Sequence, residues 1–279
     1  MRIGFDGKRA VQNFTGLGNY SRYVIDILYR FSPENEYVLY APRRRSSRVF
    51  DELLHHCPRL KTIYPEGMWK HFKSSWRTWG IASRLDKEGI DLFHGLSNEL
   101  PLTIRKARHT RSVVTIHDLI FLRYPEYYHW IDRKIYAYKF RKACEYADRV
   151  IAISECTKRD IISYFHIPEE KIKVVYQGCD VSFTLPATDE KKREVRVKYS
   201  LPEHYILNVG SIEERKNVLL AVKALLRLPE EMHLVILGRR TAYTDRIDTF
   251  IHAHHLEERV KILHGIPFAD LPAIYQQAG

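Results

Sequence analysis

The sequence predicts an α/β fold with two doubly wound parallel-sheet domains, the second of them truncated. Short runs of β-branched and aromatic residues alternate with helical stretches, and several runs are almost continuously apolar, as strands buried on both faces should be. Such alternation implies parallel pairing through right-handed crossovers. It stops at a Pro-containing connector over residues 178–190 and then begins again, so we expect domains at residues 1–185 and 186–279.

The first domain is expected to carry most of the strands. They are predicted at residues 3–6, 37–41, 91–94, 112–117, 149–154 and 171–176. Its main helices are predicted at residues 18–31, 68–87, 130–146 and 155–165. Each strand run is bounded by helical or polar sequence, which is typical of βαβ units.

The second domain repeats the pattern over a shorter length. Helices are predicted at residues 189–199, 217–228, 246–255 and 269–277, with strands at 205–209, 233–237 and 260–263. Since domains commonly reach about 100–150 residues, we expect the natural protein to continue with a further strand. The last sheet should then have an unpaired edge, a liability for aggregation.

Composition narrows the class of protein. The 279 residues fit two domains, and a hydrophobic fraction of 45% excludes wholesale disorder. The four cysteines show no Cys-x-x-Cys spacing, which favours a reduced intracellular protein over a disulfide framework or zinc site. Without a signal-peptide stretch or a bilayer-spanning run, we expect a cytoplasmic protein. The net charge of +11 favours anionic partners, whether nucleotides, nucleic acid or the inner leaflet.

A glycine-containing loop precedes the first long helix. In residues 15–22 (TGLGNYSR), Gly16 and Gly18 would let backbone N–H groups approach a phosphate at the positive end of the helix dipole. A dinucleotide fingerprint would follow the strand directly and carry a third glycine where Ser21 stands. The second strand also ends at Ala41 without a carboxylate for a ribose. The loop therefore argues against NAD and fits either a phosphate-binding turn or a tight turn without a ligand.

A His-Asp pair ends the strand predicted at residues 112–117. In open α/β sheets, ligands bind outside the carboxyl ends of the strands, so His117 and Asp118 could bond hydroxyls or tune a proton. The alternative is a histidine that is satisfied by local backbone. His94 ends the neighbouring strand in the same way.

The most specific pattern is residues 208–217 (NVGSIEERKN), where a strand ends in Gly210 and Ser211. After a short loop, Arg215 and Lys216 open a predicted helix. Gly210 permits close approach, Arg215 offers a planar fork for phosphate oxygens, and Lys216 adds a compact charge. A diphosphate suits this arrangement, and an ordinary charged helix start is the alternative.

Taken in order, the motifs resemble those of family 4 glycosyltransferases, the retaining enzymes of the two-Rossmann GT-B fold. The similarity is greatest to the bacterial mannosyltransferase-like branch that builds O-antigen and other cell-surface polysaccharides. It covers essentially the whole chain and rests on residues 15–22, 115–119, 151–160, 209–217, 234–238, 260–267 and 270–272. Each motif alone is loose, and the ordered set carries the resemblance.

The resemblance implies a role for each candidate residue. His117 would lie beside the transferred sugar, while Arg215 and Lys216 would bind the diphosphate and neutralise the leaving group. The implied donor-binding residues are Gly16, Gly18, Gly210, Ser211, Gly265 and Ile266. Of these, Gly265 and Ile266 would contact the nucleobase through the backbone.

The resemblance also implies the substrates. The donor would be a nucleotide-diphosphate sugar carrying a hexose such as mannose, and the acceptor a saccharide or a lipid-linked saccharide. No cofactor is expected, and no metal, because Asp-x-Asp is absent and Arg215 and Lys216 would replace the cation. The family's paired glutamates belong to a segment beyond Gly279, so we expect donor binding to be impaired in the 279-residue form.

An aromatic and basic segment from Met68 to Arg84 is predicted to be one helix. On it Trp69, Phe72, Trp76 and Trp79 fall within an arc of about 80°, and Lys70, Lys73, Arg77 and Arg84 within an adjacent arc of about 60°. The pattern fits a helix lying in the lipid interface, which would place the protein peripherally at an anionic inner membrane face. An amphipathic helix packed on the sheet is the alternative.

Two further clusters of side chains, one of histidines and one of arginines, could suggest a site. We interpret His252, His254 and His255, and likewise the arginines at 43–45 and 48, as solvated surface rather than sites.

A sugar-nucleotide epimerase would need paired carboxylates in its cleft. A nucleic-acid-binding protein would show a recognised module or a stacking platform, and neither occurs, so nucleic acid is not an expected partner. A truncated, inactive chain serving as a scaffold or as partner of a full-length enzyme is a third alternative.

Overall fold

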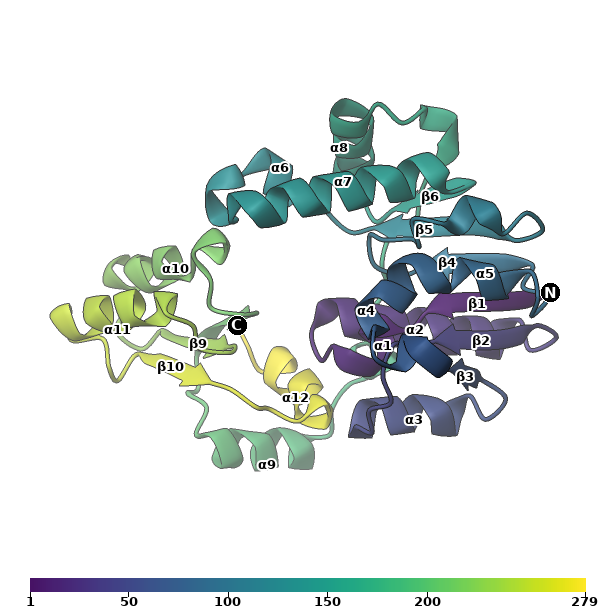
Figure 1. The fold of residues 1–279 in the computed structure, drawn as a ribbon. Helices are drawn as coiled ribbons and strands as arrows, with labels where there is room; N and C mark the ends of the chain where they lie inside the picture. Colours follow the sequence, from purple (N-terminus) through teal and green to yellow (C-terminus); the bar gives the residue numbers. More distant parts are fainter. The chain divides into compact units, whose positions relative to one another are not determined.

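The computed structural model describes residues 1–279, which form two compact units, Met1–Gly178 and Cys179–Gly279 (Figure 1). Each unit has its own parallel sheet with helices on both faces, which confirms the predicted α/β class. The division lies inside the connector from which we placed the domain boundary after residue 185. Neither unit has a helix that combines the length and apolar character needed to cross a membrane.

The sheet of residues 1–178 has seven parallel strands in the order β3-β2-β1-β4-β5-β6-β7. They are β1 (Arg2–Asp6), β2 (Glu36–Tyr40), β3 (Lys61–Ile63), β4 (Leu92–Gly95), β5 (Arg111–Ile116), β6 (Arg149–Ala152) and β7 (Ile172–Val174). Phe5 of β1 pairs with Leu39 on one side and with His94 on the other. The strand order reverses between β1 and β4, and this is the switch point at which open α/β sheets bind ligands.

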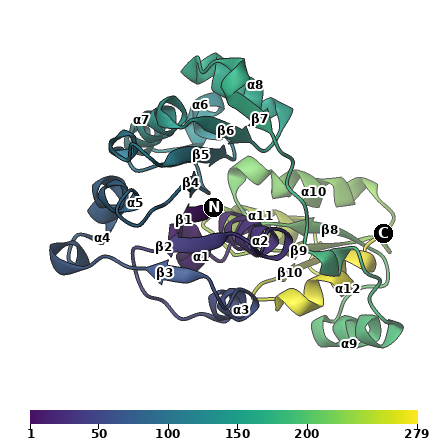
Figure 2. The same cartoon turned by 90° about the vertical axis from the view of Figure 1, so that its right-hand side faces the viewer.

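Helices cover both faces of this sheet (Figure 2). They are α1 (Lys8–Gln12), α2 (Gly16–Phe31), α3 (Arg48–His56), α4 (Lys73–Ser75), α5 (Ala82–Leu85), α6 (Ile120–Arg123), α7 (Trp130–Tyr146) and α8 (Glu155–Phe165). Tyr37 and Leu39 of β2 pack in the cluster that contains Ile25 of α2. Val38 and Tyr40 pack in the cluster on the opposite face, with α5 and α7. The period-two alternation of a strand thus places consecutive apolar residues on opposite faces.

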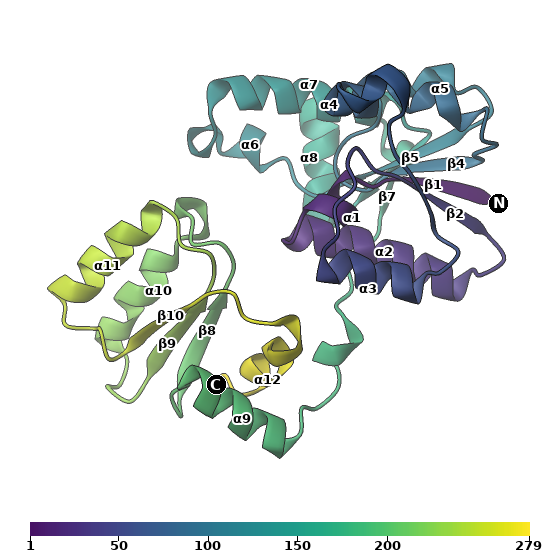
Figure 3. The ribbon, with the colours of Figure 1, turned by 60° about the horizontal axis from the view of Figure 1, so that its bottom comes forward.

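The sheet of residues 179–279 has three parallel strands in the order β10-β9-β8 (Figure 3). The elements are α9 (Asp189–Tyr199), β8 (Tyr205–Val209), α10 (Val218–Ala224), β9 (His233–Leu237), α11 (Tyr243–Ala253), β10 (Val260–Leu263) and α12 (Leu271–Gln276). Leu234 and Ile236 of the central strand pack against α10 and α11. Val235 and Leu237 pack against α9 and α12 on the other face. β8 and β10 are therefore the edge strands.

Most predicted elements are present, with small shifts at their ends. The predictions missed β3, α1, α3 and α6, which are short or carry several charged residues. The helix predicted from Asn217 to Leu228 begins at Val218, because Asn217 itself has a left-handed backbone (φ 50°). It ends at Ala224 and continues as a 3₁₀ turn to Arg227.

The prediction of one continuous helix over residues 68–87 is wrong. The segment consists of a 3₁₀ turn at Gly67–Lys70, α4, a π-helical turn at Trp76–Gly80, and α5. It breaks at Phe72, whose backbone (φ −112°, ψ 53°) leaves the helical region. A single helical wheel therefore does not describe it. Trp76 and Arg77, which that wheel placed on the aromatic and the basic arc, are buried.

Candidate active site

Three polar side chains lie at the carboxyl ends of β1, β4 and β5. Because these strands are parallel, their carboxyl ends meet at one edge of the sheet, beside the switch point. β1 ends at Asp6, His94 is the penultimate residue of β4, and β5 leads directly into His117. All three side chains are buried, so their protonation and hydrogen bonding are set by the protein rather than by solvent.

His117 is held on both nitrogens of its ring. Its Nε2 lies 3.0 Å from the carbonyl oxygen of Leu96, which can only accept, so Nε2 carries the proton. Nδ1 then accepts a hydrogen bond from the side-chain amide of Gln177 at 3.1 Å. The ring of Tyr20 meets the imidazole edge-on, with centroids 4.6 Å apart. Burial lowers the pKa of His117 below its ordinary value, so the ring is a neutral imidazole with an acceptor at Nδ1.

The backbone of His117 is fixed as well. Its N–H donates to Asn98 Oδ1 at 2.7 Å, and the hydroxyl of Thr157 donates to its carbonyl oxygen at 3.1 Å. The Leu96 contact satisfies His117 with a backbone group, as the alternative interpretation expects, but that group comes from the segment after β4 rather than from the neighbouring sequence. Gln177, in contrast, is a side chain from a distant segment, and a ligand hydroxyl could donate to Nδ1 in its place.

A second set of polar contacts ties helix α2 to the same edge. His94 Nε2 lies 2.8 Å from Thr115 Oγ1, and the hydroxyl of Tyr20 lies 3.1 Å from the same oxygen. Burial lowers the pKa of His94 to about 4 and raises the pKa of Tyr20. Since Tyr20 is in the second turn of α2, these contacts hold the start of that helix beside His117.

The two loop glycines are glycine for different reasons. A Cβ on Gly18 would lie 1.8 Å from the carbonyl oxygen of Asn13, whereas a Cβ on Gly16 would meet nothing within 4 Å. Asn13 Oδ1 accepts from the N–H groups of Thr15 (2.9 Å) and Gly18 (3.0 Å). The N–H groups of Gly16 and Leu17 have no protein acceptor. Packing therefore explains Gly18, and Gly16 is the position open to a phosphate.

A network of buried charged side chains, which we did not predict from the sequence, lies at the end of β1. Arg77 Nε and Nη2 lie 2.7 and 2.6 Å from Asp6 Oδ2, and Nη1 lies 2.7 Å from Glu99. Lys139 Nζ lies 3.4 Å from Glu99. Burial alone would lower the pKa of Arg77, but the two carboxylates raise it above its ordinary value. The available signal was Asp6, a carboxylate at the end of an otherwise apolar strand.

In residues 179–279, the predicted donor-binding residues follow the carboxyl ends of two strands. Gly210 and Ser211 come after β8, and Gly265 and Ile266 come after β10. Gly210 (φ 146°) and Gly265 (φ 68°) have backbones that other residues rarely adopt, and a Cβ on either would meet nothing within 4 Å. Gly238, after β9, is a further constraint that we did not predict, since its Cβ would lie 1.9 Å from the carbonyl oxygen of Gly210. This edge therefore offers open backbone to a ligand.

Arg215 and Lys216 lie in the 3₁₀ turn Glu214–Lys216, ahead of α10 rather than inside its first turn. Arg215 Nε donates to Glu213 Oε2 at 3.0 Å. Lys216 is exposed and has no ion pair. Lys216 can thus bind an anion directly, whereas Arg215 would have to break its ion pair with Glu213 before it could bind an anion.

The candidate residues fall into one set per unit. Residues 1–178 bring His117 to the start of α2, next to Gly16 and Gly18. Residues 179–279 hold Gly210, Ser211, Arg215, Lys216, Gly265 and Ile266 in the loops at one edge of their sheet.

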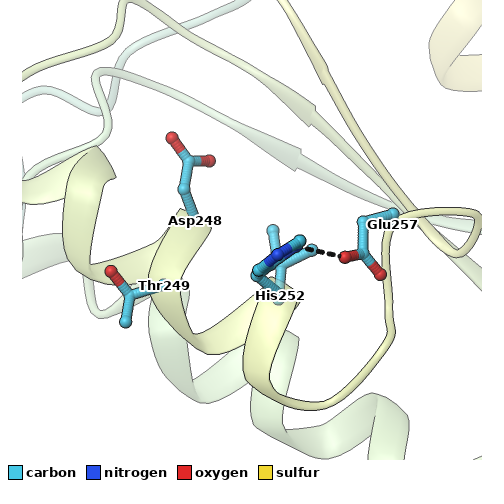
Figure 4. A pocket seen from close by; sticks show the side chains of 5 residues that line it. Asp248, Thr249, His252 and Glu257 are labelled. Carbon is cyan, nitrogen blue, oxygen red and sulfur yellow. Dashed lines mark hydrogen bonds and ion pairs between the residues drawn. The ribbon is translucent and has the colours of Figure 1, made fainter.

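The histidines near the end of α11 belong to a different feature. A cavity of about 420 Å³ is lined there by Asp248, Thr249, Ile251, His252 and Glu257 (Figure 4). His252 Nδ1 lies 2.6 Å from Glu257 Oε1. No group of three or more His, Cys, Asp or Glu side chains is placed to hold a metal ion. Glu257 precedes β10, so this cavity lies at the amino end of that strand, opposite the glycine loops.

Two family models match consecutive parts of the chain. The one described as Glycosyltransferase Family 4 matches residues 21–183, more than half of the 279 residues. The one described as Glycosyl transferases group 1 matches residues 188–279.

Curated relatives include O-antigen mannosyltransferases. The chain is 28% identical over 193 residues to O-antigen chain mannosyltransferase B of Escherichia coli, covering 67% of this chain and 49% of that protein. It is 24% identical over 167 residues to O-antigen chain mannosyltransferase RfbU of Salmonella typhimurium, covering 60% and 43%. The chain thus spans about half the length of these relatives.

Solved structures share the fold. HepE of Anabaena, crystallised with UDP-glucose, matches with a TM-score of 0.72 at 17% identity, covering 100% of this chain and 72% of that one. A glycosyltransferase of Rickettsia africae matches with a TM-score of 0.67 at 16% identity, covering 99% and 71%.

Proposed function

The chain belongs to glycosyltransferase family 4, and we propose that it transfers a hexose, with mannose preferred, from a nucleoside-diphosphate sugar to a saccharide or lipid-linked acceptor with retention. The observation that carries the proposal is at the carboxyl ends of β8 and β10, where Gly210 and Gly265 leave backbone open and the loop after β8 carries the cations Arg215 and Lys216. The names of the relatives, O-antigen chain mannosyltransferases, support mannose and the synthesis of a cell-surface polysaccharide.

The two cations fit the chemistry of the departing group. The bond from the sugar to the diphosphate breaks, negative charge grows on the diphosphate, and the acceptor oxygen forms the new bond to the sugar while its proton passes to an oxygen of the departing diphosphate. Lys216 holds no carboxylate that competes for this charge, and Arg215 offers two parallel N–H donors once Glu213 is displaced. Such a site would need neither a metal nor an organic cofactor.

The remaining candidates take supporting roles in this proposal. His117 Nδ1 would accept from a hydroxyl of the transferred sugar in place of Gln177, and the N–H of Gly16 would approach the donor phosphate or the acceptor. Backbone groups of Gly265 and Ile266 would contact the nucleobase. A lipid-linked acceptor resides in a bilayer, so the proposal places the enzyme on the cytoplasmic face of a membrane as a peripheral protein.

Calorimetry with GDP, GDP-mannose, UDP and UDP-glucose tests the donor site. We expect saturable binding of a nucleoside diphosphate, tighter for the guanine series, and a loss of roughly tenfold or more in Lys216→Ala. The matched control is Arg246→Ala, which removes a nearby exposed cation that pairs with Glu214. Absence of nucleotide binding, or equal affinities in Lys216→Ala and Arg246→Ala, would refute the assignment of this edge.

A further inference from the structure

A groove of about 490 Å³ lies between the turn Trp76–Gly80 and the first half of α7. Its apolar lining includes Trp79, Leu102, Ile135 and Tyr138, and Lys134 and Lys139 supply cations. We call it the α7 groove. The turn is fixed to the rest of the unit, because the N–H of Leu102 donates to the carbonyl oxygen of Thr78 at 2.9 Å. The groove is therefore part of the fold.

The apolar surface extends beyond the groove along α7. Ile131 lies one helical turn before Ile135, and Trp130 one turn before Lys134, so these side chains follow the same face of the helix. Trp130 is 66% exposed, Ile131 51%, Tyr138 57% and Trp79 51%. So many large apolar side chains exposed together mark an interaction surface rather than ordinary solvated residues.

All four tryptophans of the chain are in the two segments that form this surface: Trp69, Trp76, Trp79 and Trp130. Three are exposed, and only Trp76 is in the core. The surface thus differs from the single amphipathic helix that we predicted. Trp76 and Arg77 are buried and so are not part of the observed surface, whereas α7, which the predicted helix did not include, contributes to it.

The charge around this surface is strongly positive. Residues 67–79 contain no Asp or Glu, and residues 127–142 contain one, Asp132, against five Lys or Arg. Lys70, Lys73 and Lys134 have no ion pair in the structure. Cations that no carboxylate neutralises favour an anionic partner.

We propose that the α7 groove and its flanks bind the surface of an anionic lipid bilayer, with Trp79, Trp130 and Ile131 inserted at the level of the head groups. Trp and Tyr are the residues that prefer this interface, and nearby Lys residues are attracted to anionic lipids. A protein partner fits less well, because Lys is depleted from the cores of protein interfaces. The reason that the protein would bind a membrane rests on the proposed function, because a lipid-linked acceptor would be found in a bilayer.

Vesicle binding by the full chain tests the inference without donor or acceptor. We expect the protein to sediment with phosphatidylcholine vesicles that contain a third phosphatidylglycerol, and roughly tenfold less with pure phosphatidylcholine. Tryptophan emission should shift to the blue on binding, and lipids brominated near the head group should quench it. Trp79→Phe and Trp130→Phe should each reduce that quenching.

The deciding comparison is Ile131→Gln/Tyr138→Gln against Val197→Gln/Leu220→Gln. The first pair lies on the proposed surface, and the second consists of apolar residues in residues 179–279 that are more exposed than the first pair. We expect a loss of vesicle affinity of roughly tenfold or more for the first pair, from the lost burial of two side chains, and none for the second. Circular dichroism before mixing verifies that both variants are folded.

Three outcomes would overturn the inference. They are equal vesicle binding by the two double variants, equal binding to neutral and anionic vesicles, and self-association of the chain through the α7 groove with no vesicle binding. Calorimetry with nucleotides is run on the same proteins. Loss of vesicle binding with intact nucleotide binding would contradict the membrane surface alone, whereas the reverse result would contradict the donor site alone.

Discussion

Arg77 donates a hydrogen bond from Nε to Asp6 Oδ2 at 2.7 Å, its Nη2 lies 2.6 Å from the same oxygen as an ion pair, and neither side chain is more than 7% exposed. The pair joins the π-helical turn Trp76–Gly80 to the end of the interior strand β1. It therefore connects the turn that carries Trp79 of the α7 groove to the strand that ends at the switch point.

We expect Arg77→Met to lower the free energy of unfolding of residues 1–178 by about 3–5 kcal/mol, because it leaves Asp6 buried without a counter-charge and leaves Glu99 with Lys139 alone. Urea unfolding followed by tryptophan emission reports on this unit, where all four tryptophans lie. Arg84→Met, which removes a half-buried partner of Glu88, should change stability by about 1 kcal/mol or less. When Asp6→Asn is added to Arg77→Met, part of the lost stability should return. If it does not, the lost stability does not come from the unpaired charge of Asp6.

Gly16→Ala and Gly18→Ala should separate binding from packing. The Cβ of the second would collide with the Asn13 carbonyl, so we expect clear destabilisation and a lower melting temperature. The Cβ of the first meets only open space, and Gly16 is in a helix, so stability should be unchanged or rise by about 0.5–1 kcal/mol. If Gly16 lies against a substrate, Gly16→Ala should still lower kcat/KM. A stable variant with normal kcat/KM would show that the loop is a turn without a ligand.

The buried histidines should make stability depend on pH. The pKa of His94 is lowered to about 4 by burial, so between pH 6.5 and 4 the unfolded chain binds a proton that the folded chain does not. Stability should therefore fall as pH falls, by about 2 kcal/mol between pH 7 and pH 5 from His94, with His117 adding in the same direction. The urea concentration at the midpoint of unfolding, determined at several pH values between 7 and 5, measures this change in stability. His94→Gln should flatten the curve.

Lys216→Ala and Arg215→Ala should each lower kcat by about 10²–10³-fold in an active preparation, since the lost charge acts on the departing diphosphate. The fold should be unaffected, because both side chains are exposed in a surface turn. Radioactive transfer from GDP-mannose measures the rate. Near-normal turnover in both variants would remove the two residues from the mechanism.

Transfer should proceed in EDTA at the rate seen without it, because the two cations of the turn Glu214–Lys216 would take the place of a metal on the diphosphate. Assays with EDTA, and with manganese restored, measure this. Activity that EDTA abolishes and manganese recovers would contradict the metal-free mechanism.

Periodicity was sufficient wherever an element is long and regular. The bounds of α7, α8 and α9 agree with the predicted ranges, because their apolar residues and the caps of α8 and α9 are local features. The prediction of one helix over residues 68–87 was wrong. The segment breaks at Phe72, and Arg77 in its π-helical turn pairs with Asp6, a residue far away in the sequence that no local pattern indicates.

The candidate residues were found to different degrees. Gly210 was singled out because it follows a strand and Gly265 because of the family resemblance, and the backbone of both has positive φ. The partners of His117 could not be predicted, since Gln177 and Leu96 reach it only once the sheet has formed. The exposed face of α7 was missed because its apolar residues do not form a narrow stripe at its start, so the helix has no evident amphipathic pattern.

The strand order also bears on synthesis of the chain. β1 takes one neighbour, β2, from residues 36–40, but its other neighbour, β4, only from residues 92–95. At about 5–20 residues per second, the ribosome needs roughly 3–10 s to make the intervening stretch. During that interval an apolar strand edge has no partner, with its hydrogen-bonding groups open to other nascent chains. The first third of the chain is therefore where a chaperone would be needed before translation ends.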